Sequence, residues 1–247
     1  MRILVAPDKF KGSLAAAAVA ANIAAGLREA LPTAEVVERA IADGGEGTAA
    51  VICAARRGHW HRCNVHDAIG NPVVANYCTV HGGGIAILEM AEASGLARIP
   101  QDQRDPLTAS SFGTGEMLLA AANAGVQQII IGLGGSATID GGYGTARALG
   151  FSFLDADDRP LGHNVADLLQ LVRIHCPPRL RLPPVVTAAD VRNPLLGGRG
   201  ATRVFGPQKG VTADQIELVE TALQQLADVV ARDLGIDART TPGAGAA

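Results

Sequence analysis

The residues between Ile129 and Gly150 are the types best suited to binding an anion. They read IIIGLGGSATIDGGYGTARALG, so an apolar strand-like run leads into a glycine-rich loop and then into a helix-like segment. Glycines let backbone N–H groups approach a phosphate, and a helix N-terminus adds a partial positive charge. The candidate binding residues of this loop are Gly134, Gly135, Ser136, Thr138 and Asp140. The pattern favours a loop that handles phosphate.

Two other interpretations of the same loop remain. Gly132, Gly134 and Ala137 fit the G-x-G-x-x-G/A fingerprint of dinucleotide-binding proteins, and Asp155 follows at a suitable distance. That fingerprint needs its helix to begin inside the glycines, whereas Asp140-Gly-Gly delays the expected helix. A glycine turn without any ligand is the other alternative, although the loop is more polar than a plain connection needs.

Paired carboxylates occur in a second glycine-rich segment, ADGGEGT at 42–48. Asp43 and Glu46 stand three residues apart around Gly44 and Gly45, which suits a divalent cation or a substrate hydroxyl. They could equally serve the start of the following helix, because acidic residues favour helix N-termini. The sequence leaves both roles open.

A third carboxylate, Asp190, follows an expected buried strand at 185–188. A carboxylate at the carboxyl end of a strand is well placed to act as a catalytic base or a metal ligand. Asn193 lies in the same loop, and an Asx turn before Pro194 would explain these residues without any catalytic role.

Lysine is scarce, because only Lys9, Lys11 and Lys209 are lysines among 21 basic residues. A compact ammonium suits a phosphate, so these three positions are candidates for anion contacts, although chance could also place them. Asp8 and Ser13 share the first loop with two of these lysines.

The segment at 108–116, TASSFGTGE, is a further candidate anion cradle at the start of an expected helix. Its candidate residues are Ser110, Ser111, Gly113 and Thr114.

His59, His61, Cys63 and His66 could share a strand face with the geometry of a zinc site. Such an alternation is more often a polar strand face, and the four cysteines include no C-x-x-C pair.

Bulk properties narrow the class of protein. The chain has 247 residues, 48% of them hydrophobic and 18% charged, which is typical of a globular protein with a real core. A net charge of −3 argues against a nucleic-acid or acidic-membrane surface. Without a signal peptide or a long apolar run, we expect a cytoplasmic protein with no membrane segment.

Periodicity predicts an α/β fold. We expect a strand at 2–6, a helix after Ser13 and a second strand at 35–40, and this order predicts that the two strands pair in parallel. Ser13 is the expected helix cap, and the apolar stripe of the helix consists of Val19, Ile23, Leu27 and Leu31. Segments near 59–67, 72–80 and 84–90 predict a meander, with a domain boundary near residue 70. Thr212 and Gln215 predict a capping box, and the helix that follows should end at Gly235.

Taken together, these loops resemble the bacterial ATP-dependent glycerate kinase family, whose members phosphorylate D-glycerate, commonly at the 2-hydroxyl. The matching stretches, in order along the whole chain, are APDKFKGSL (6–14), ADGGEGT (42–48), PLTASSFGTGE (106–116), IGLGGSATIDGG (131–142), ADVRNPLLG (189–197) and VFGPQKG (204–210).

The resemblance implies a two-domain α/β architecture with the active site in the cleft between a Rossmann-like three-layer domain and an inserted α/β domain. Residues 1–70 would form the N-terminal part of the Rossmann-like domain, 71–235 the inserted domain, and 236–247 a tail returning to the first. Such kinases continue beyond this sequence, so the resemblance implies a C-terminally truncated kinase with an incomplete Rossmann-like domain, whose activity alone is not implied.

The reaction implied is transfer of the ATP γ-phosphoryl group to D-glycerate, with 2-phosphoglycerate the favoured product. We expect Lys9, Lys11 and Lys209 to hold anionic groups, Asp43 and Glu46 to hold Mg²⁺, and Asp190 or Asp140 to orient the attacking hydroxyl. The expected ligands are thus ATP, Mg²⁺ and D-glycerate, and a homo-oligomer is compatible with the sequence. The alternatives are a non-catalytic fragment that binds nucleotide without turnover and, less favoured, an NAD-dependent dehydrogenase.

Overall fold

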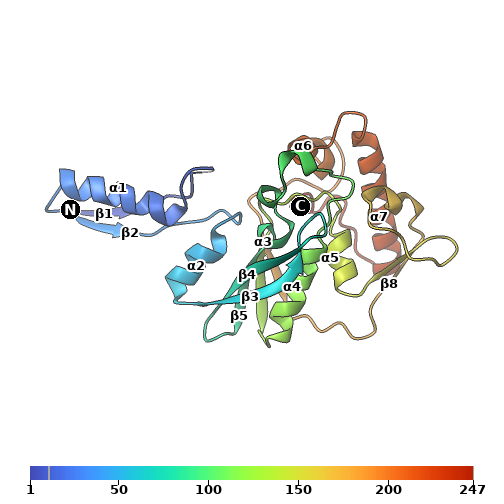
Figure 1. Cartoon of the computed structure of the whole chain (residues 1–247), viewed down its shortest axis with the longest axis horizontal. Coiled ribbons are helices and arrows are strands. Elements are labelled where there is room, and N and C mark those ends of the chain that lie inside the picture. Colours follow the sequence, from blue (N-terminus) through green and yellow to red (C-terminus); the bar gives the residue numbers. More distant parts are fainter. Residues whose placement is uncertain (11, 247) are drawn as a thin grey trace.

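The computed structural model describes residues 1–10 and 12–246, so Lys11 lies outside the described residues. A narrow N-terminal unit projects from a larger body that contains the remaining elements (Figure 1). The mixed α/β class predicted from the sequence is confirmed.

The N-terminal unit consists of β1 (Arg2–Val5), α1 (Ala16–Ala30) and β2 (Glu35–Glu38), with β1 and β2 paired in parallel. This confirms the expected strand, helix and strand. The apolar stripe is only partly buried: Val19 is covered, whereas Ile23 is 42% exposed and Leu31 is 39% exposed. The sheet under α1 has only two strands, which is too narrow to cover the whole helix face.

The predicted cap of this helix is wrong. The residue before the first helical turn is Ala15, and no side chain caps the helix. Phe10 and Leu14 instead form an isolated antiparallel bridge, which places Ser13 inside a tight turn two residues before the N-cap.

A five-stranded sheet forms the centre of the body, in the order β3, β4, β5, β6 and β9. Its strands are β3 (His59–His66), β4 (Pro72–Val80), β5 (Ile85–Glu89), β6 (Gln128–Gly132) and β9 (Val185–Ala188). The first three pair antiparallel, which confirms the predicted meander, and the last three pair in parallel. Parallel pairing brings the carboxyl ends of β5, β6 and β9 to one edge of the sheet, where α/β proteins place ligands.

Helices cover both faces of this sheet. On one face, α4 (Phe112–Asn123) buries Met117 against Leu88 and Ile129. On the other face, α2 (Thr48–Arg56) packs against Ile87. Neighbouring positions of β5 therefore face opposite layers, as the two-residue period of a strand requires. Each such buried side chain contributes about 1.5–3 kcal/mol of hydrophobic stabilisation.

A second core lies beyond the sheet, around α7 (Ile216–Leu234). The elements near it are α5 (Tyr143–Ala148), β7 (Ser152–Leu154), β8 (Arg173–His175) and α6 (Ala201–Lys209). Val219 and Leu223 of α7 are fully buried, and the helix ends, as predicted, at Gly235, which has a left-handed conformation. The predicted capping box is wrong, because the helix begins at Ile216 with Gln215 as the residue before it and without a side-chain cap. Gln215 Oε1 still accepts from the Thr212 amide, but within a turn that precedes the helix.

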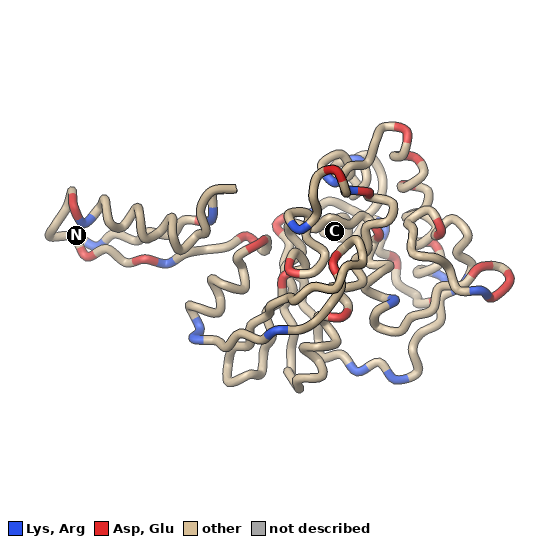
Figure 2. Tube along the Cα trace, in the orientation of Figure 1, with Lys and Arg blue, Asp and Glu red and all other residues tan. Residues whose placement is uncertain are grey.

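Short helices complete the connections: α3 (Ala91–Ser94) and 3₁₀ turns at Leu96–Arg98, Gln101–Gln103 and Val165–Gln170. Among the described residues, no helix combines the length and the apolar character needed to cross a membrane. Acidic and basic residues are interspersed along the trace (Figure 2).

The predicted domain boundary falls within a single sheet. Residue 70 lies in the turn between β3 and β4, which pair along their whole length, so both sides of it belong to one sheet. The change from the two-stranded to the five-stranded sheet falls instead between β2 and α2. The division into a Rossmann-like and an inserted domain stays a prediction.

Candidate functional site

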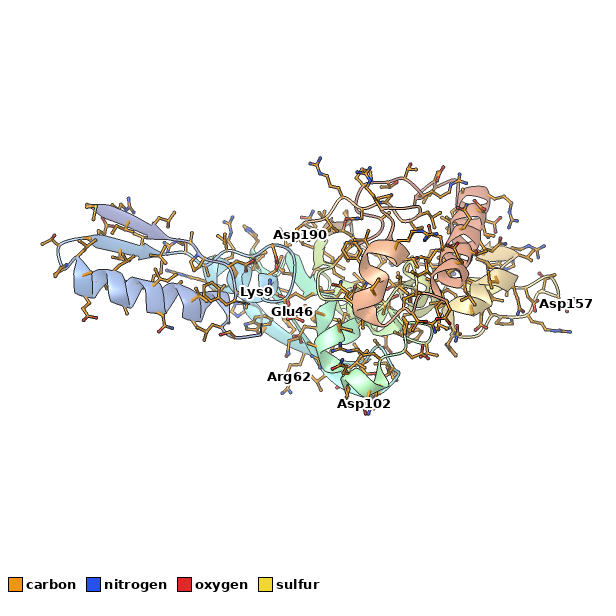
Figure 3. All side chains as sticks on the ribbon, turned by 90° about the horizontal axis from the view of Figure 1, so that it is seen from above. Lys9, Glu46, Arg62, Asp102, Asp157 and Asp190 are labelled. Carbon is orange, nitrogen blue, oxygen red and sulfur yellow. The ribbon has the colours of Figure 1, made fainter. Side chains whose placement is uncertain are left out.

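A cleft of about 1260 Å³ lies where the N-terminal unit meets the carboxyl edge of the central sheet. The predicted site residues that line it are Asp8, Lys9, Ser13, Asp43, Gly45, Glu46, Gly134, Gly135, Ser136, Asp190 and Lys209. Lys9, Glu46 and Asp190 are seen together at this junction, whereas Asp157 lies at the far end of the body (Figure 3). Residues far apart in the sequence are thus brought to one cavity.

An ion pair between Lys9 and Asp43 joins the first two loops. The Lys9 ammonium lies 3.0 Å from Asp43 Oδ1 and 3.8 Å from Asp8 Oδ1. Burial alone would lower the pKa of Lys9, but the hydrogen bond and charge of Asp43 outweigh it and raise this pKa. The Gly45 amide, which also donates to Asp43 Oδ1, is the main cause of the lowered Asp43 pKa. The pair is therefore charged at neutral pH.

The loop at 42–48 packs directly on the backbone of the central glycine loop. A Cβ added at Gly132 would lie 2.3 Å from the Gly44 carbonyl oxygen, and one at Gly134 would lie 2.6 Å from the Gly45 Cα. Both are closer than real Cβ atoms approach. These glycines are needed so that the two loops can touch, which is a different role from the phosphate contact that their sequence pattern suggested.

Glu89, at the end of β5, accepts hydrogen bonds from the backbone at the end of the 42–48 loop. Its Oε2 accepts from the Gly47 amide at 3.0 Å and its Oε1 from the Ala49 amide at 2.6 Å, at the start of α2. The side chain is buried, and burial raises its pKa although the two amides act in the opposite direction. Sequence reasoning missed Glu89, although it ends a predicted strand, the same signal that singled out Asp190.

Asp140 is buried and fully engaged by the protein. Its Oδ2 accepts from the Ser111 amide, the Ser111 hydroxyl and the Gly144 amide, and its Oδ1 accepts from the Gly142 amide. These donors lie at the starts of α4 and α5. Asp140 is therefore the anion that the starts of both helices bind. The anion sites predicted at 108–116 and at the start of α5 are filled by this side chain of the protein itself.

The hydroxyl-rich residues of 108–116 do not line the cleft. Ser111, Gly113 and Thr114 are buried, and the Thr114 hydroxyl lies 2.9 Å from that of Ser94. A Cβ at Gly113 would lie 1.8 Å from the His66 carbonyl oxygen, so this glycine allows α4 to approach β3. Ser110 accepts from the Phe112 amide at the helix start.

Lys209, at the end of α6, is buried against the central loop. Its ammonium donates to the Ser136 hydroxyl at 2.9 Å and to the Thr138 carbonyl at 2.5 Å. Burial lowers the Lys209 pKa to about 8, and the charge of Asp140 opposes this only in part. The hydroxyl of Thr138 itself is buried and has no hydrogen-bond partner among the described residues.

Asp190 and Asn193 differ in their placement. Asp190 is exposed in the cleft two residues beyond β9, at the sheet edge where it was expected. Asn193 donates instead to the Arg199 carbonyl, which steadies the loop before α6.

Arg104 also lines the cleft, and sequence reasoning did not find it. Its guanidinium donates to the backbone carbonyls of Leu96 and Ile99. It follows no recognisable motif, so only the fold brings it to the site.

The alternating histidines of β3 have protein partners. His61 stacks on Tyr77 and bonds the Thr79 hydroxyl, while His66 pairs with Glu116. No cluster of three or more histidine, cysteine or acidic side chains with metal-binding geometry occurs in residues 1–10 and 12–246. These contacts fit the polar strand face that the sequence favoured.

Chemically, the cleft offers one ion-paired ammonium, one buried ammonium, glycine-loop amides and partly or fully exposed carboxylates, which are those of Asp8, Glu38, Asp43, Glu46 and Asp190. Such a set can hold anionic groups and orient a hydroxyl for group transfer. The helix that follows the central glycine loop, α5, begins only at Tyr143, beyond the glycines, which does not fit the dinucleotide fingerprint.

Comparison with known proteins identifies the family to which the chain is similar. The family model described as the glycerate kinase family matches residues 3–247. The chain is 42% identical over its whole length to a glycerate kinase of Haemophilus influenzae and 43% identical to a glycerate 2-kinase of Escherichia coli. It covers 66% of each, so it spans just under two thirds of the length of these curated relatives.

A solved structure from Salmonella typhimurium LT2, which carries a glycerate kinase 2 assignment, has the same fold. It superposes with a TM-score of 0.87 at 43% identity, covering 99% of this chain and 66% of the other. The family match and this superposition agree over nearly every residue. The chain therefore belongs to the glycerate kinase family.

Proposed function

We propose that the chain acts in ATP-dependent phosphorylation of D-glycerate, with the 2-hydroxyl as the favoured acceptor. The observation that carries the proposal is the cleft itself, in which Lys9, Asp43, Asp190 and Lys209 from four separate segments converge at the sheet edge. The names of its relatives, which include a glycerate 2-kinase, supply the substrate.

In the proposed reaction a glycerate hydroxyl oxygen attacks the γ-phosphorus of ATP. A new P–O bond forms, the bond between the γ-phosphorus and the β,γ-bridging oxygen breaks, and ADP leaves with its electron pair. Asp190 is the candidate acceptor of the hydroxyl proton, because it is exposed in the cleft whereas Asp140 is committed to four internal donors. Lys9 and Lys209 would offset phosphate or carboxylate charge.

The carboxylates of the cleft fit a magnesium ion by their chemistry. Mg²⁺ is usually held by one or two carboxylates together with substrate phosphates and water. Asp43 Oδ1 accepts hydrogen bonds from the Lys9 ammonium and the Gly45 amide. Glu46, in the same loop, is exposed. Asp43 and Glu46 are thus the residues that would hold it. When bound, the ion would neutralise charge on the transferred phosphate.

The test is ADP release by the 247-residue chain with Mg-ATP, with and without D-glycerate. Glycerate-dependent release supports the proposal. ADP release at the same rate with and without glycerate, or no ADP release from either mixture, contradicts glycerate phosphorylation by this chain.

A non-catalytic fragment is the second candidate, favoured by the exposed apolar side chains of the N-terminal unit, where Leu4 is 64% exposed and Phe10 is 59% exposed. Nucleotide binding by calorimetry without ADP release would support it.

A further inference from the structure

The buried lysine at the end of α6 has an unusual environment for a cation. Lys209 is 3% exposed, yet it borders the cleft beside Ser136. Its two hydrogen-bond acceptors, the Ser136 hydroxyl and the Thr138 carbonyl, are both uncharged. An ammonium has three N–H donors, so one remains beyond these two bonds.

The charge of Lys209 is poorly compensated within the protein. Among the carboxylates of residues 1–10 and 12–246, none forms an ion pair with it. Asp140 acts on it through space, but its oxygens are held by Ser111, Gly142 and Gly144. A buried cation without an ion-paired partner is costly, and an anion that reaches it removes part of that cost.

Other charged residues belong to the segments near Lys209. Asp140 comes from the loop before α5 and acts on Lys209 through its charge. The backbone of Arg104 lies near Gly210, but its guanidinium donates to the Leu96 and Ile99 carbonyls. Glu46 approaches the central loop at Gly135. Among the described residues, the hydrogen-bond partners of the Lys209 ammonium are the Ser136 hydroxyl and the Thr138 carbonyl, and none of these charged groups pairs with it.

We propose that Lys209 and Ser136 form an anion subsite, which takes one carboxylate or phosphate group of a small acidic ligand and binds a proton together with it. The proposal deepens the proposed function and rests on it for the choice of D-glycerate as a probe. Carboxylate and phosphate share the chemistry required, and separate titrations with the two anions distinguish them.

The sign of the pH dependence follows from the environment of the amine. Burial holds the pKa of Lys209 at about 8 without a ligand, and a bound anion would raise it. At pH values between the pKa of Lys209 in the free protein and its pKa in the complex, binding of the anion therefore takes up a proton. The affinity is highest below pH 8 and weakens by up to about tenfold for each pH unit above it.

The experiment is isothermal titration calorimetry with the full chain between pH 7 and pH 9. The probes are D-glycerate and inorganic phosphate, titrated separately and without nucleotide. Each titration is repeated in two buffers with different ionisation enthalpies, so that the difference in heat reports the protons taken up. We expect a small uptake at pH 7 and a larger one between pH 8 and pH 9 for whichever anion occupies the subsite.

Lys209→Met tests the residue directly, since it keeps the length of the side chain and removes the charge. We expect the affinity to fall by about tenfold to a hundredfold, as for loss of a hydrogen bond to a charged group, with no proton uptake. The melting temperature without ligand should be unchanged or higher, because an unpaired buried charge is removed. A purely structural lysine would give the opposite pattern, with lower melting temperature and unchanged affinity.

Arg62→Met is the matched control, because it removes one positive charge from an exposed position of β3 that is not among the residues lining the cleft (Figure 3). It should leave both affinity and proton uptake unchanged. If Lys209→Met does not fold, proton uptake by the wild-type chain decides the question.

The outcomes separate this proposal from the proposed function. Phosphate binding with proton uptake and no glycerate binding supports the subsite and counts against glycerate as substrate. Glycerate binding without proton uptake, or with full affinity in Lys209→Met, overturns the subsite and leaves the proposed function standing. Binding of neither probe overturns the subsite.

Discussion

Two aspartates that look equivalent in the sequence have very different surroundings. Asp140 is buried and accepts hydrogen bonds from the starts of two helices, whereas Asp190 is exposed in the cleft. Asp140→Asn would replace a charged acceptor by an amide whose NH₂ faces backbone donors. We expect it to lower the free energy of unfolding by about 3 kcal/mol, measured by urea denaturation.

Asp190→Asn should behave in the opposite way. Because the side chain is exposed, the free energy of unfolding should change by less than about 0.5 kcal/mol. ADP release in the presence of glycerate should fall at least about a hundredfold if Asp190 accepts the hydroxyl proton. Near-normal turnover in Asp190→Asn would remove Asp190 from that role.

At the scale of elements, contact between the two glycine loops depends on the absence of side chains. Gly134→Ala would press a methyl group onto the Gly45 backbone, at 2.6 Å before any movement. We expect a loss of about 1–3 kcal/mol in unfolding free energy, together with weaker ligand binding, because the backbone cannot move aside as a flexible side chain would.

Gly26→Ala is the matched control for this substitution. Gly26 lies inside α1, and a Cβ there would meet nothing within 4 Å. Alanine should stabilise the helix by about 0.5–1 kcal/mol. A similar gain in Gly134→Ala would contradict the tight contact between the loops.

Glu89 connects two further elements, β5 and α2. Glu89→Gln leaves one oxygen for two amide donors, so we expect a loss of about 1–3 kcal/mol in unfolding free energy. Burial raises the pKa of Glu89 in the folded protein above its unfolded value. The contribution of Glu89 to the free energy of unfolding is therefore fully present below its pKa in the unfolded chain. It is lost as the pH rises through its pKa in the folded protein.

The comparison to make for Glu89 is between wild type and Glu89→Gln at pH 4 and pH 7. The subtraction cancels the contributions of the other acidic groups. The remaining difference in unfolding free energy should be larger at pH 4, because the raised pKa means that the fold favours the protonated form of Glu89. A difference that grows toward pH 7 would contradict the raised pKa, because it would mean that the fold stabilises Glu89 as the anion.

At the scale of the whole molecule, the N-terminal unit and the body differ in how much they bury. Leu4, Phe10 and Ile23 of the unit are exposed, whereas Leu88 and Ile129 of the central sheet are fully buried. Segments with few buried apolar contacts open at low free-energy cost. We expect amide hydrogen exchange in α1 and β1 to be at least about tenfold faster than in β5 and β6, measured by mass spectrometry.

An anionic ligand in the cleft contacts both parts if the proposed function holds. Binding that spans Lys9 and Lys209 should slow exchange in the 7–15 and 42–48 segments. Slowing confined to the body would place the ligand away from the N-terminal unit.

Local sequence patterns determined much of the fold. Alternating and continuous apolar runs predicted the strands at 59–90 and 129–131, and helical periodicity predicted α7 with its end at Gly235. The expected strand at 185–188 also predicted that Asp190 would lie at the carboxyl end of a strand, where the structure has it. These features depend on a residue and its near neighbours, which is why a sequence can reveal them.

Tertiary structure alone decided how the polar groups are used. It turned Asp140 inward as the anion for α4 and α5, brought Glu89 beneath α2, and buried Lys209 beside Ser136. It also left the α1 stripe half covered, because only two strands lie beneath it. Hydrogen-bond partners and burial depend on groups that are distant in sequence, and local periodicity carries no information about which of them will meet.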